Sequence, residues 1–389
     1  MSAPAVAGRG RDRVHLERRL HVAPRRAAGM RILGAAAALV LAAGILQLTG
    51  RSAVSLTGEA LRSTFGSRFG LEETALIATP ILLAAIAVAI PLRMRLWNIG
   101  VEGQFYMGAW AAAGVGIYVD VPGPLLLILM ALAGAAAGAI WIALPAIARA
   151  WWGVNEIITT LLLNFVAILW VGWFSIEIWR DRAAAVIQAT PLVRATIPRL
   201  PGATILHAGV VVPIALAVVF WYVFRNTRWG FEVDIAGGNP RAAEFAGVDV
   251  RRRIITVMLM SGAIGGLSGM IHLAGATFRL QQTISNSYGL SGFIVAALAG
   301  ASFVGVLVGG AFIATLLHAG IALQGTGLSV YIVVAVYGLV LVGIAVGEQA
   351  ARYRLVLGRD GGRTPRAGPP ERASPDPAAT GPPEEGSAA

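Results

Sequence analysis

The stretch LWNIGVEGQFYMG, residues 96–108, combines features that a membrane-embedded helix rarely tolerates. It lies between two long apolar runs, yet it carries Asn98, Glu102 and Gln104 and is interrupted by three glycines. A carboxylate inside a bilayer costs about 2.5–3.5 kcal/mol on insertion scales, so it needs a partner or a function. Loosened backbone at membrane depth persists only where it faces protein or a water-filled cavity. On a helix, Asn98 and Glu102 point the same way because they are four residues apart. The three polar side chains are therefore candidates for a transport pathway or a gate.

Composition places the chain among polytopic membrane proteins. Of its 389 residues, 57% are hydrophobic and 13% are charged, and the mean hydropathy is +0.72. The formal net charge of +11 comes from arginines in tails and loops beside apolar runs, where they set orientation and meet anionic membrane lipid, so no nucleic-acid partner is expected.

Two amino acids are missing, and their absence excludes several kinds of chemistry. Without cysteine there is no disulfide, thiolate metal site or cysteine nucleophile, and without lysine there is no P-loop for ATP hydrolysis. No HExxH, GxSxG or clustered His/Asp set appears, so a membrane enzyme is disfavoured. We predict no catalytic residue, metal site or cofactor, and any ATPase must be a separate subunit.

The apolar runs predict an all-α membrane protein with about ten transmembrane helices, some of them short or discontinuous. Residues 280–347 contain no Asp, Glu, Lys or Arg and fit roughly three crossings of ~20 residues each. Breaks are expected near 300–302 and 325–327, and one of the first two crossings is a candidate half-helix. The other seven spans are predicted at 32–48, 74–92, 96–119, 125–148, 155–179, 205–224 and 254–276. Residues 49–73 and 180–204 are expected to be external loops.

Charge distribution predicts the orientation and the domain boundaries. With ten spans, 23 of the 31 arginines lie on the side of both termini and 8 on the other side. The positive-inside rule then places both termini in the cytoplasm. The predicted parts are an arginine-rich tail (1–31), a transmembrane domain (32–347) with a large internal segment (225–253), and a cytoplasmic tail (348–389) whose Pro, Gly and Ala content indicates disorder.

A second polar segment, NEIITTLLLNF at 155–165, opens the fifth predicted span. Asn155 and Glu156 are candidate pathway residues, but both also suit a helix start, where Asn caps and an acid is favourable. Asn164 lies deeper, so it favours a cavity or an interhelical hydrogen bond. The same alternatives apply to the first stretch: Asn98 can cap a helix, and Glu102 can pair with Arg95 or with a backbone donor.

Glycine spacing predicts where helices pack closely. Gly134 and Gly138 form a GxxxG pair, and Gly262, Gly266 and Gly269 form a ridge of small residues. Small residues let two helix backbones approach each other in a membrane. His272, near the end of the seventh span, is interpreted as a packing residue.

Three segments resemble a known family. The string ATPILLAAIAVAIPLRMRLWNIGVEGQFYMGA (78–109) resembles the permease subunits of ABC importers for branched-chain amino acids, simple sugars and nucleosides. The segment 155–165 is similar to the nucleoside branch. The string GGNPRAAEFAGVDVRRRIITVMLMSGAIGGLSGM (237–270) resembles the cytoplasmic coupling loop and the span that follows it. The resemblance covers about 74–345.

This resemblance implies partners and an energy-coupling element. The partners are ABC ATPase subunits, a second permease subunit (identical or different) and an extracytoplasmic substrate-binding lipoprotein. The coupling helix that docks on the ATPase would span about 240–247. Gly238 and Asn239 would interrupt the regular secondary structure just before it. Its expected contact residues also include Arg241, Ala242, Ala243 and Gly247. Arg241 stands where many importers have Glu, and the turn at 299–305 is shorter than in many relatives.

The function expected from this resemblance is inward nucleoside transport through a bacterial inner-membrane, multi-pass permease. Transport would proceed by alternating access and would be driven by a separate ATPase. Two alternatives stay open: a simple-sugar, ribose-like ABC permease, and an ion-coupled secondary carrier with Glu102 as its proton site.

Overall fold

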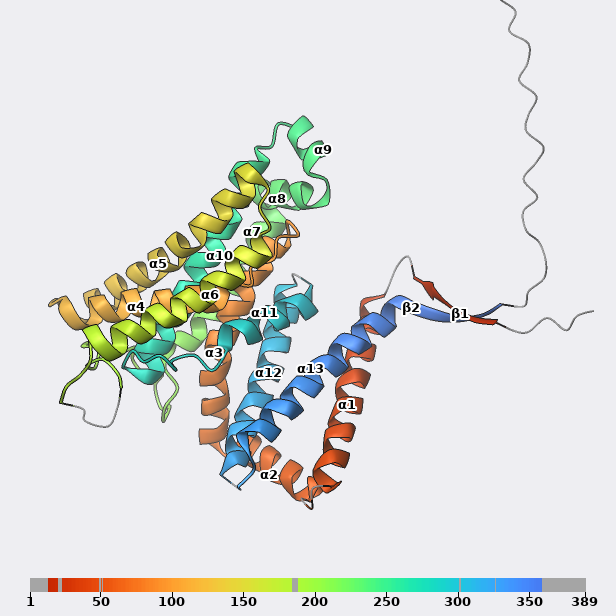
Figure 1. Cartoon of the computed structure of the whole chain (residues 1–389), viewed down its shortest axis with the longest axis horizontal. Coiled ribbons are helices and arrows are strands. Elements are labelled where there is room, and N and C mark those ends of the chain that lie inside the picture. Colours follow the sequence, from red (N-terminus) through yellow and green to blue (C-terminus); the bar gives the residue numbers. More distant parts are fainter. Residues whose placement is uncertain are drawn as a thin grey trace, which may run out of the picture.

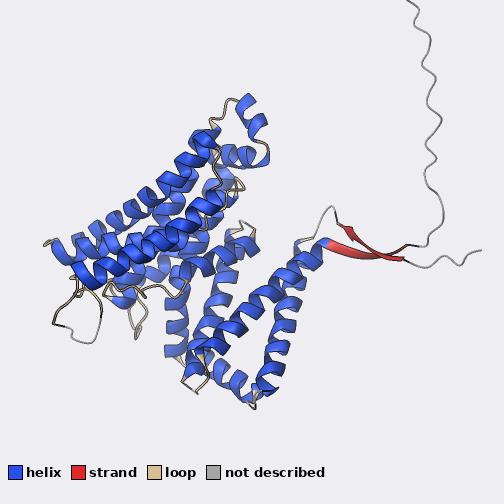
Figure 2. Cartoon of the chain, in the orientation of Figure 1, coloured by secondary structure: helices blue, strands red, loops and turns tan. Residues whose placement is uncertain are grey.

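The computed structural model describes residues 13–19, 23–48, 50, 52–183, 188–300, 302–325 and 327–358. These residues form thirteen α-helices and one two-stranded sheet (Figure 2). Within them, eight helical segments are long and apolar enough to cross a membrane, which confirms the predicted all-α membrane fold. They are built on α1 (Pro24–Leu48), α3 (Arg68–Leu92), α5 (Gly123–Trp152), α6 (Glu156–Trp173), α7 (Val211–Asn226), α10 (Val250–His272), α12 (Phe303–Gln324) and α13 (Val330–Arg352).

Two further apolar helices complete the predicted set of about ten. Helix α4 (Val101–Tyr118) has 18 residues and is largely buried inside the bundle, whereas α11 (Tyr288–Ala299) has only 12. Helix α11 is thus the expected short helix of the uncharged region. The breaks after it and after α12 fall at Gly300–Ser302 and Gly325–Gly327, as predicted.

One predicted loop is wrong. Residues 52–73 are not an external loop, because they form α2 (Ala53–Phe65) and the first turn of α3. The polar residues that suggested a loop are helix caps: Ser52 accepts a hydrogen bond from the Ser55 N–H, and Ser67 accepts one from the Gly70 N–H. Serine at an N-cap satisfies a backbone donor that the helix leaves free.

The core of the bundle is formed by α3, α4, α5 and α10, which lie side by side in Figure 1. Helices α5 and α10 cross through the two predicted glycine ridges. A Cβ at Gly266 would clash with the carbonyl oxygen of Gly134, and a Cβ at Gly138 would clash with that of Gly262. Gly108 brings α4 equally close to Gly266. The prediction of close glycine packing is confirmed, because the backbones meet where no side chain intervenes.

Helices α1 and α13 form a second close pair at the edge of the bundle (Figure 1). Gly34 of α1 packs against Gly343 of α13, and Gly347 packs against the backbone of Met30. Arg31 and Glu348 form an ion pair of 2.6 Å beside this contact. The glycines again permit backbone contact, and the ion pair fixes the register of the two helices.

The two chain ends leave the bundle together. Strand β1 (Arg13–Arg18) pairs antiparallel with β2 (Tyr353–Gly358), from Arg13 opposite Gly358 to Arg18 opposite Tyr353. Both tails therefore leave from one end of the bundle, as an even number of spans requires; their cytoplasmic location stays a prediction. The proposed disordered tail begins later than 348, since α13 reaches Arg352, and 359–389 lie outside the described residues.

We expect Gly266→Ala to destabilise the bundle, because the added methyl group has no space against the backbone of α5. Alanine is favoured over glycine in a helix by about 1 kcal/mol, so a loss of stability would have to come from packing, where excess volume costs roughly 1–3 kcal/mol. The matched control is Gly338→Ala in α13, where a Cβ meets nothing within 4 Å. Thermal unfolding in detergent should show a lower midpoint for Gly266→Ala only. Equal midpoints would contradict the close contact.

Candidate functional site

The residues that connect α3 to α4 form a buried polar network. Asn98 has 0% and Gln104 1% of its surface exposed. Their side-chain amides exchange two hydrogen bonds: Asn98 Nδ2 donates to Gln104 Oε1 at 3.1 Å, and Gln104 Nε2 donates to Asn98 Oδ1 at 3.0 Å. Asn98 Nδ2 also donates to Ser261 Oγ of α10 at 2.7 Å, and Ser261 Oγ donates to the Ala87 carbonyl of α3 at 2.6 Å. The network ties three helices together through one turn.

Glu102 lies elsewhere than its spacing from Asn98 suggested. Helix α4 begins only at Val101, so Asn98 is not helical and the two side chains do not share a helix face. The Glu102 carboxylate accepts hydrogen bonds from the N–H groups of Gly289 (2.7 Å) and Leu290 (3.2 Å), in the first turn of α11. Backbone donors, rather than Arg95, are therefore its partners. A carboxylate is favourable there, because it faces the positive end of the helix dipole.

The N-terminus of α11 depends on this contact. Its N-cap residue, Ser287, has φ +59° and makes no side-chain cap hydrogen bond. Ser285 Oγ accepts from the Tyr288 N–H at 3.1 Å, and Glu102 caps the next two N–H groups from another helix. Gly289 packs directly on the Glu102 backbone, so a larger residue has no room there.

Helix α6 holds the same turn from a third side. Asn164 Oδ1 accepts a hydrogen bond from the Gly103 N–H at 2.8 Å, and its Nδ2 donates to the Ile99 carbonyl at 2.9 Å. Asn164 makes the interhelical hydrogen bonds that were one of its two predicted roles. Each of these bonds satisfies a backbone group that the interrupted helix leaves free.

Glu156 and Asn155 have the roles typical of a helix start. Glu156 is 5% exposed, its Oε1 accepts from the Trp97 N–H at 3.2 Å, and its Oε2 lies 3.3 Å from Arg149 Nε. Asn155 is exposed and caps α6, since its Oδ1 accepts from the Ile157 N–H at 2.9 Å. Three of the six candidate pathway residues thus belong to the 96–108 stretch, Glu156 and Asn164 hydrogen-bond to it, and Asn155 only caps α6. Their role in a pathway stays a prediction.

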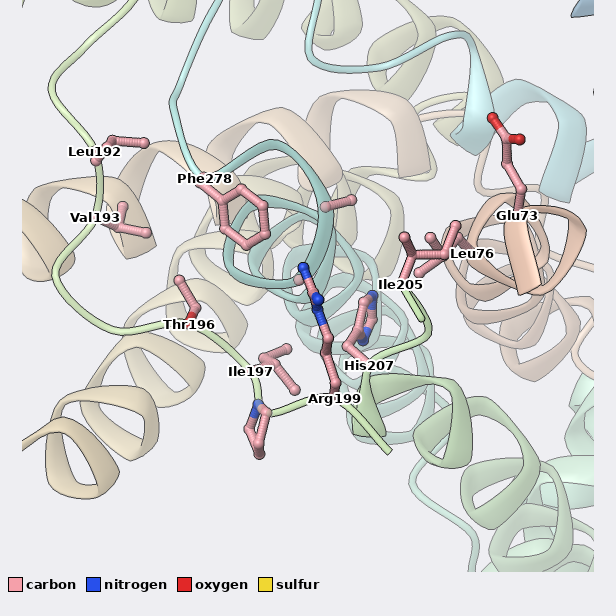
Figure 3. A pocket seen from close by; sticks show the side chains of 13 residues that line it. Glu73, Leu76, Leu192, Val193, Thr196, Ile197, Arg199, Ile205, His207 and Phe278 are labelled. Carbon is pink, nitrogen blue, oxygen red and sulfur yellow. The ribbon is translucent and has the colours of Figure 1, made fainter. Parts of the chain in front are cut away.

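An open cavity of about 570 Å³ lies at the end of the bundle where α3 begins and α10 ends (Figure 3). Its lining comes from α3, from residues 192–207 and from the π-helical turn Leu273–Thr277 after α10. Figure 3 shows Arg199 extending between Phe278 and His207, with Glu73 on the opposite side. This volume lies in the usual range of about 300–1,000 Å³ for small-molecule sites.

The cavity wall is mostly apolar and carries few charges. Leu76, Val193, Ile197 and Phe278 supply apolar surface, whereas Glu73 and Arg199 are its charged groups. His207 is 2% exposed, and burial lowers the pKa of its imidazole, so it is neutral at neutral pH. Its Nδ1 accepts a hydrogen bond from the Gly209 N–H at 3.1 Å, which leaves the proton on Nε2.

Residues 192–207 form one wall of this cavity. Main-chain hydrogen bonds hold this loop to the segment that follows α10. The N–H groups of Val193 and Ile197 donate to the carbonyls of Phe278 and Ala274, each at 3.0 Å. Arg279 adds an ion pair with Asp181 at 2.8 Å. The expected external loop is therefore an ordered wall in the part that the structure describes.

At the opposite end of the bundle, α8 (Arg228–Gly238) and α9 (Pro240–Phe245) project beyond the long helices (Figure 1). Asn239 caps α9 by accepting from the Ala242 N–H at 3.2 Å, and Gly247 ends the segment with φ +81°, a conformation that favours glycine. Of the other expected coupling residues, Gly238, Arg241 and Ala242 are exposed and Ala243 is buried.

Two ion-pair groups fix α8 to the bundle. Arg93 Nη1, at the end of α3, lies 3.1 Å from Asp234 Oδ2, and its guanidinium stacks 4.7 Å from the Phe224 ring centroid. Glu232 pairs with Arg228 at 2.9 Å and also with Arg253 of α10. Burial pushes the pKa of Glu232 up, but the hydrogen bonds and charges of these two arginines outweigh it and hold the pKa below its usual value.

Several residues of these sites escaped prediction from the sequence. Arg93 was not among the predicted site residues, yet it joins α3 to α7 and α8. Phe245, at the end of α9, is 94% exposed. Its position as an aromatic residue in a short polar segment was the sequence signal that could have marked it as a contact residue. The cavity gave no local signal, because residues as distant in sequence as Glu73, Arg199 and Phe278 build it.

A bundle of apolar helices with an open cavity at one end and a projecting short helix at the other defines a membrane permease subunit. The chain belongs to the family described as "Branched-chain amino acid transport system / permease component", which matches residues 70–345. Members of this family are the membrane-spanning subunits of ABC transporters. They are transport components rather than enzymes, they work with an ATPase and a substrate-binding protein, and they are multi-pass proteins of the bacterial plasma membrane.

Three relatives illustrate the range of similarity. The chain is 34% identical to a glucose ABC transporter permease of Haloferax volcanii over 76% of this chain and 81% of that protein. It is 32% identical to a guanosine ABC transporter permease of Bacillus subtilis over 69% and 79%. It is 30% identical to a nucleoside ABC transporter permease of Lactococcus lactis over 63% and 70%. These names support the recognition from sequence motifs and leave the substrate open between nucleosides and sugars.

We expect Glu102→Ala to destabilise the protein, because the first turn of α11 loses the acceptor for two N–H groups in a buried site. Loss of a cap costs about 0.5–2 kcal/mol, and an unsatisfied buried donor about 1–3 kcal/mol. Glu102→Gln keeps one acceptor oxygen and should lose much less.

Thermal unfolding and transport should be measured for both variants, because a capping role and a transport role of Glu102 predict different results. If Glu102 is a cap, stability and uptake fall together in Glu102→Ala and are largely kept in Glu102→Gln. Normal stability in both variants, combined with loss of uptake in Glu102→Gln, would instead identify Glu102 as a transport residue.

Proposed function

We propose that this chain is the permease subunit through which an ABC importer moves nucleosides into the cell. Its similarity to guanosine and nucleoside permeases carries this proposal, together with the nucleoside-type segment at 155–165. The permease performs no covalent chemistry, and a separate ATPase drives its alternation between two orientations of the pathway. Its partners are the ATPase, a second permease, identical or different, and an extracytoplasmic binding lipoprotein.

The chemistry of the large cavity supports a nucleoside as the cargo. A monosaccharide is surrounded by hydroxyl groups, and a site for it has to provide many hydrogen-bonding side chains. The cavity offers few such groups, but its wall contains the Phe278 ring and the Arg199 guanidinium. Aromatic and guanidinium planes stack on a purine or pyrimidine base, while Glu73 or Thr196 can bind ribose hydroxyls. We assign this cavity as the entry chamber for the substrate.

A simple sugar is the second candidate, because the glucose permease relative is 34% identical to this chain. The two candidates differ in which part of the ligand the cavity must hold. A sugar permease would depend on its hydrogen-bonding groups, whereas a nucleoside permease would depend on Arg199 and Phe278 as well.

Energy transfer from the ATPase to the pathway follows from the contacts of α8. In this proposal the ATPase binds α9, and a displacement of α9 moves α8 as one unit with it. Asp234 passes the displacement to Arg93 and so to the turn that carries Asn98, while Glu232 passes it to Arg253 and α10. The turn leads directly into α4, whose Glu102 caps α11, so a movement at α9 reaches α11 through hydrogen-bonded groups.

Phe245→Ala should weaken binding of the ATPase, because Phe245 is the most exposed large apolar side chain of the projecting segment. A buried aromatic side chain contributes about 2–4 kcal/mol at the centre of an interface. Phe231→Ala is the matched control, since Phe231 is 63% exposed on neighbouring α8 but lies outside the expected docking helix. Co-purification of the ATPase with the tagged permease should fall for Phe245→Ala only. The docking assignment fails if both variants retain the ATPase equally.

Uptake by the complete importer tests the substrate. Unlabelled adenosine should compete with labelled nucleoside uptake, whereas ribose, glucose and leucine should not. Arg199→Ala should reduce uptake about tenfold, as expected when a stacking contact of roughly 1–2 kcal/mol is lost. Arg194→Ala is the control on the same loop, because Arg194 pairs with the exposed Asp120 and does not line the cavity.

Each other outcome of this experiment has a distinct meaning. Competition by glucose or ribose, without competition by adenosine, would establish the sugar alternative. Uptake that continues after the ATPase is deleted would overturn the ABC mechanism and favour an ion-coupled carrier. Equal loss in Arg199→Ala and Arg194→Ala would remove the cavity from the substrate route.

A further inference from the structure

A second cavity, of about 270 Å³, lies between α1, α2, α12 and α13. Helix α12 packs against α3, whereas α1 and α13 lie at the edge of the bundle in Figure 1, and the cavity lies where α1 and α13 approach α2 and α12. The lining uses the second half of α1, the second half of α12 and the first half of α13. It therefore lies in the half of the membrane nearest to α2, which the arginine distribution predicts to be the outer leaflet.

The wall of this cavity is almost entirely apolar. Leucine, valine and alanine side chains dominate, and four residues contribute hydroxyl groups. Three of these hydroxyls already donate to protein acceptors: Thr57 to the Ala53 carbonyl at 2.8 Å, Thr315 to the Ala311 carbonyl at 2.9 Å, and Tyr337 to Ser291 Oγ at 3.1 Å.

Thr64 of α2 is the exception. Its side chain lines the cavity, the residue is 1% exposed, and its Oγ1 has no hydrogen-bond partner in the described part of the chain. A threonine in a helix readily bonds the carbonyl four residues earlier. A buried hydroxyl without an acceptor is unfavourable, so a ligand that carries an acceptor would stabilise this site.

The chemistry of the cavity excludes water as its occupant. A buried water molecule needs two to four polar partners, and one free hydroxyl does not hydrate a space of 270 Å³. A flexible hydrocarbon chain fits the apolar wall.

The surroundings also favour lipid. Leu39, Leu61 and Phe65 line the cavity and are 41%, 55% and 55% exposed, so its apolar wall continues onto the outer surface of the helices. At this depth the outer surface faces lipid, and a chain can enter from the bilayer without crossing polar surface. Helices α1 and α2 lie outside the family match at 70–345, so half of the wall belongs to this chain rather than to the shared permease domain.

We propose that this cavity is a binding site for a phospholipid, one of whose acyl chains inserts between the α1–α13 pair and α2–α12. The ester carbonyl at the start of that chain accepts the hydrogen bond of the Thr64 hydroxyl. The bound lipid fills the space that separates the α1–α13 pair from the core and so acts as part of its packing.

The experiment uses the full-length permease in nanodiscs made with phosphatidylglycerol that carries a photoreactive diazirine on one acyl chain. After illumination, mass spectrometry locates the labelled peptides. We expect labelling to concentrate on α2 and on the second half of α12. Ala319→Phe fills the cavity and should reduce this labelling at least tenfold, whereas Ala311→Phe, on the exposed face of the same helix, should leave it unchanged.

Thr64→Val tests the hydrogen bond with almost no change in volume, and it also serves if Ala319→Phe does not fold. A neutral hydrogen bond of about 0.5–1.5 kcal/mol corresponds to a loss of roughly two- to tenfold in lipid retention, measured by native mass spectrometry. The proposal is overturned by labelling spread evenly over all exposed helices, by equal labelling in the wild type and Ala319→Phe, or by retention of free fatty acid in place of phospholipid. Unchanged retention in Thr64→Val would overturn the assigned position of the ester.

Discussion

A polypeptide that leaves its helix inside a membrane has to find new hydrogen-bond partners within the protein, since the lipid offers none. The turn between α3 and α4 is the place where this chain meets that constraint. The side chains of Asn98 and Gln104 bind each other, and those of Asn98 and Asn164 bind free backbone groups around the turn. Ser261 then connects the turn to α3 and α10. The core helices are therefore positioned around one buried polar centre, and the glycine contacts set how closely they approach it.

This arrangement changes the meaning of the intramembrane acid. From the sequence alone, Glu102 is a candidate proton-binding or substrate-binding residue. In the structure it spans the gap between α4 and the short α11 and binds two N–H groups there. Ser285 accepts from the Tyr288 N–H, and Glu102 satisfies the next two N–H groups, which the first turn of α11 would otherwise leave free. The same contact makes α11 responsive to the position of α4, which a permease with two orientations requires.

The overall fold could be predicted because its signals are local. Apolar length predicted the spans, and the glycine spacings of α5 and α10 predicted their contact. The loop proposed at 49–73 failed because Ser52 and Ser67 are equally typical of loops and of helix caps. The polar partners could not be predicted, since Glu102 and Gly289 are far apart in sequence and meet only through tertiary packing. The cavity was missed for the same reason, and its charged residues look like ordinary loop and helix-end residues.

The pairing of α1 with α13 has a consequence for how the protein is made. Residues 49–329 are synthesised between these two helices, so α1 enters the membrane long before its partner exists. Until then its glycine face, including Gly34, rests against lipid or against the insertion machinery. Completion of the fold is thereby delayed to the end of translation, when α13 arrives and the strands of the two tails can join. A chain that stops before α13 therefore leaves the glycine face of α1 without the helix that it packs against.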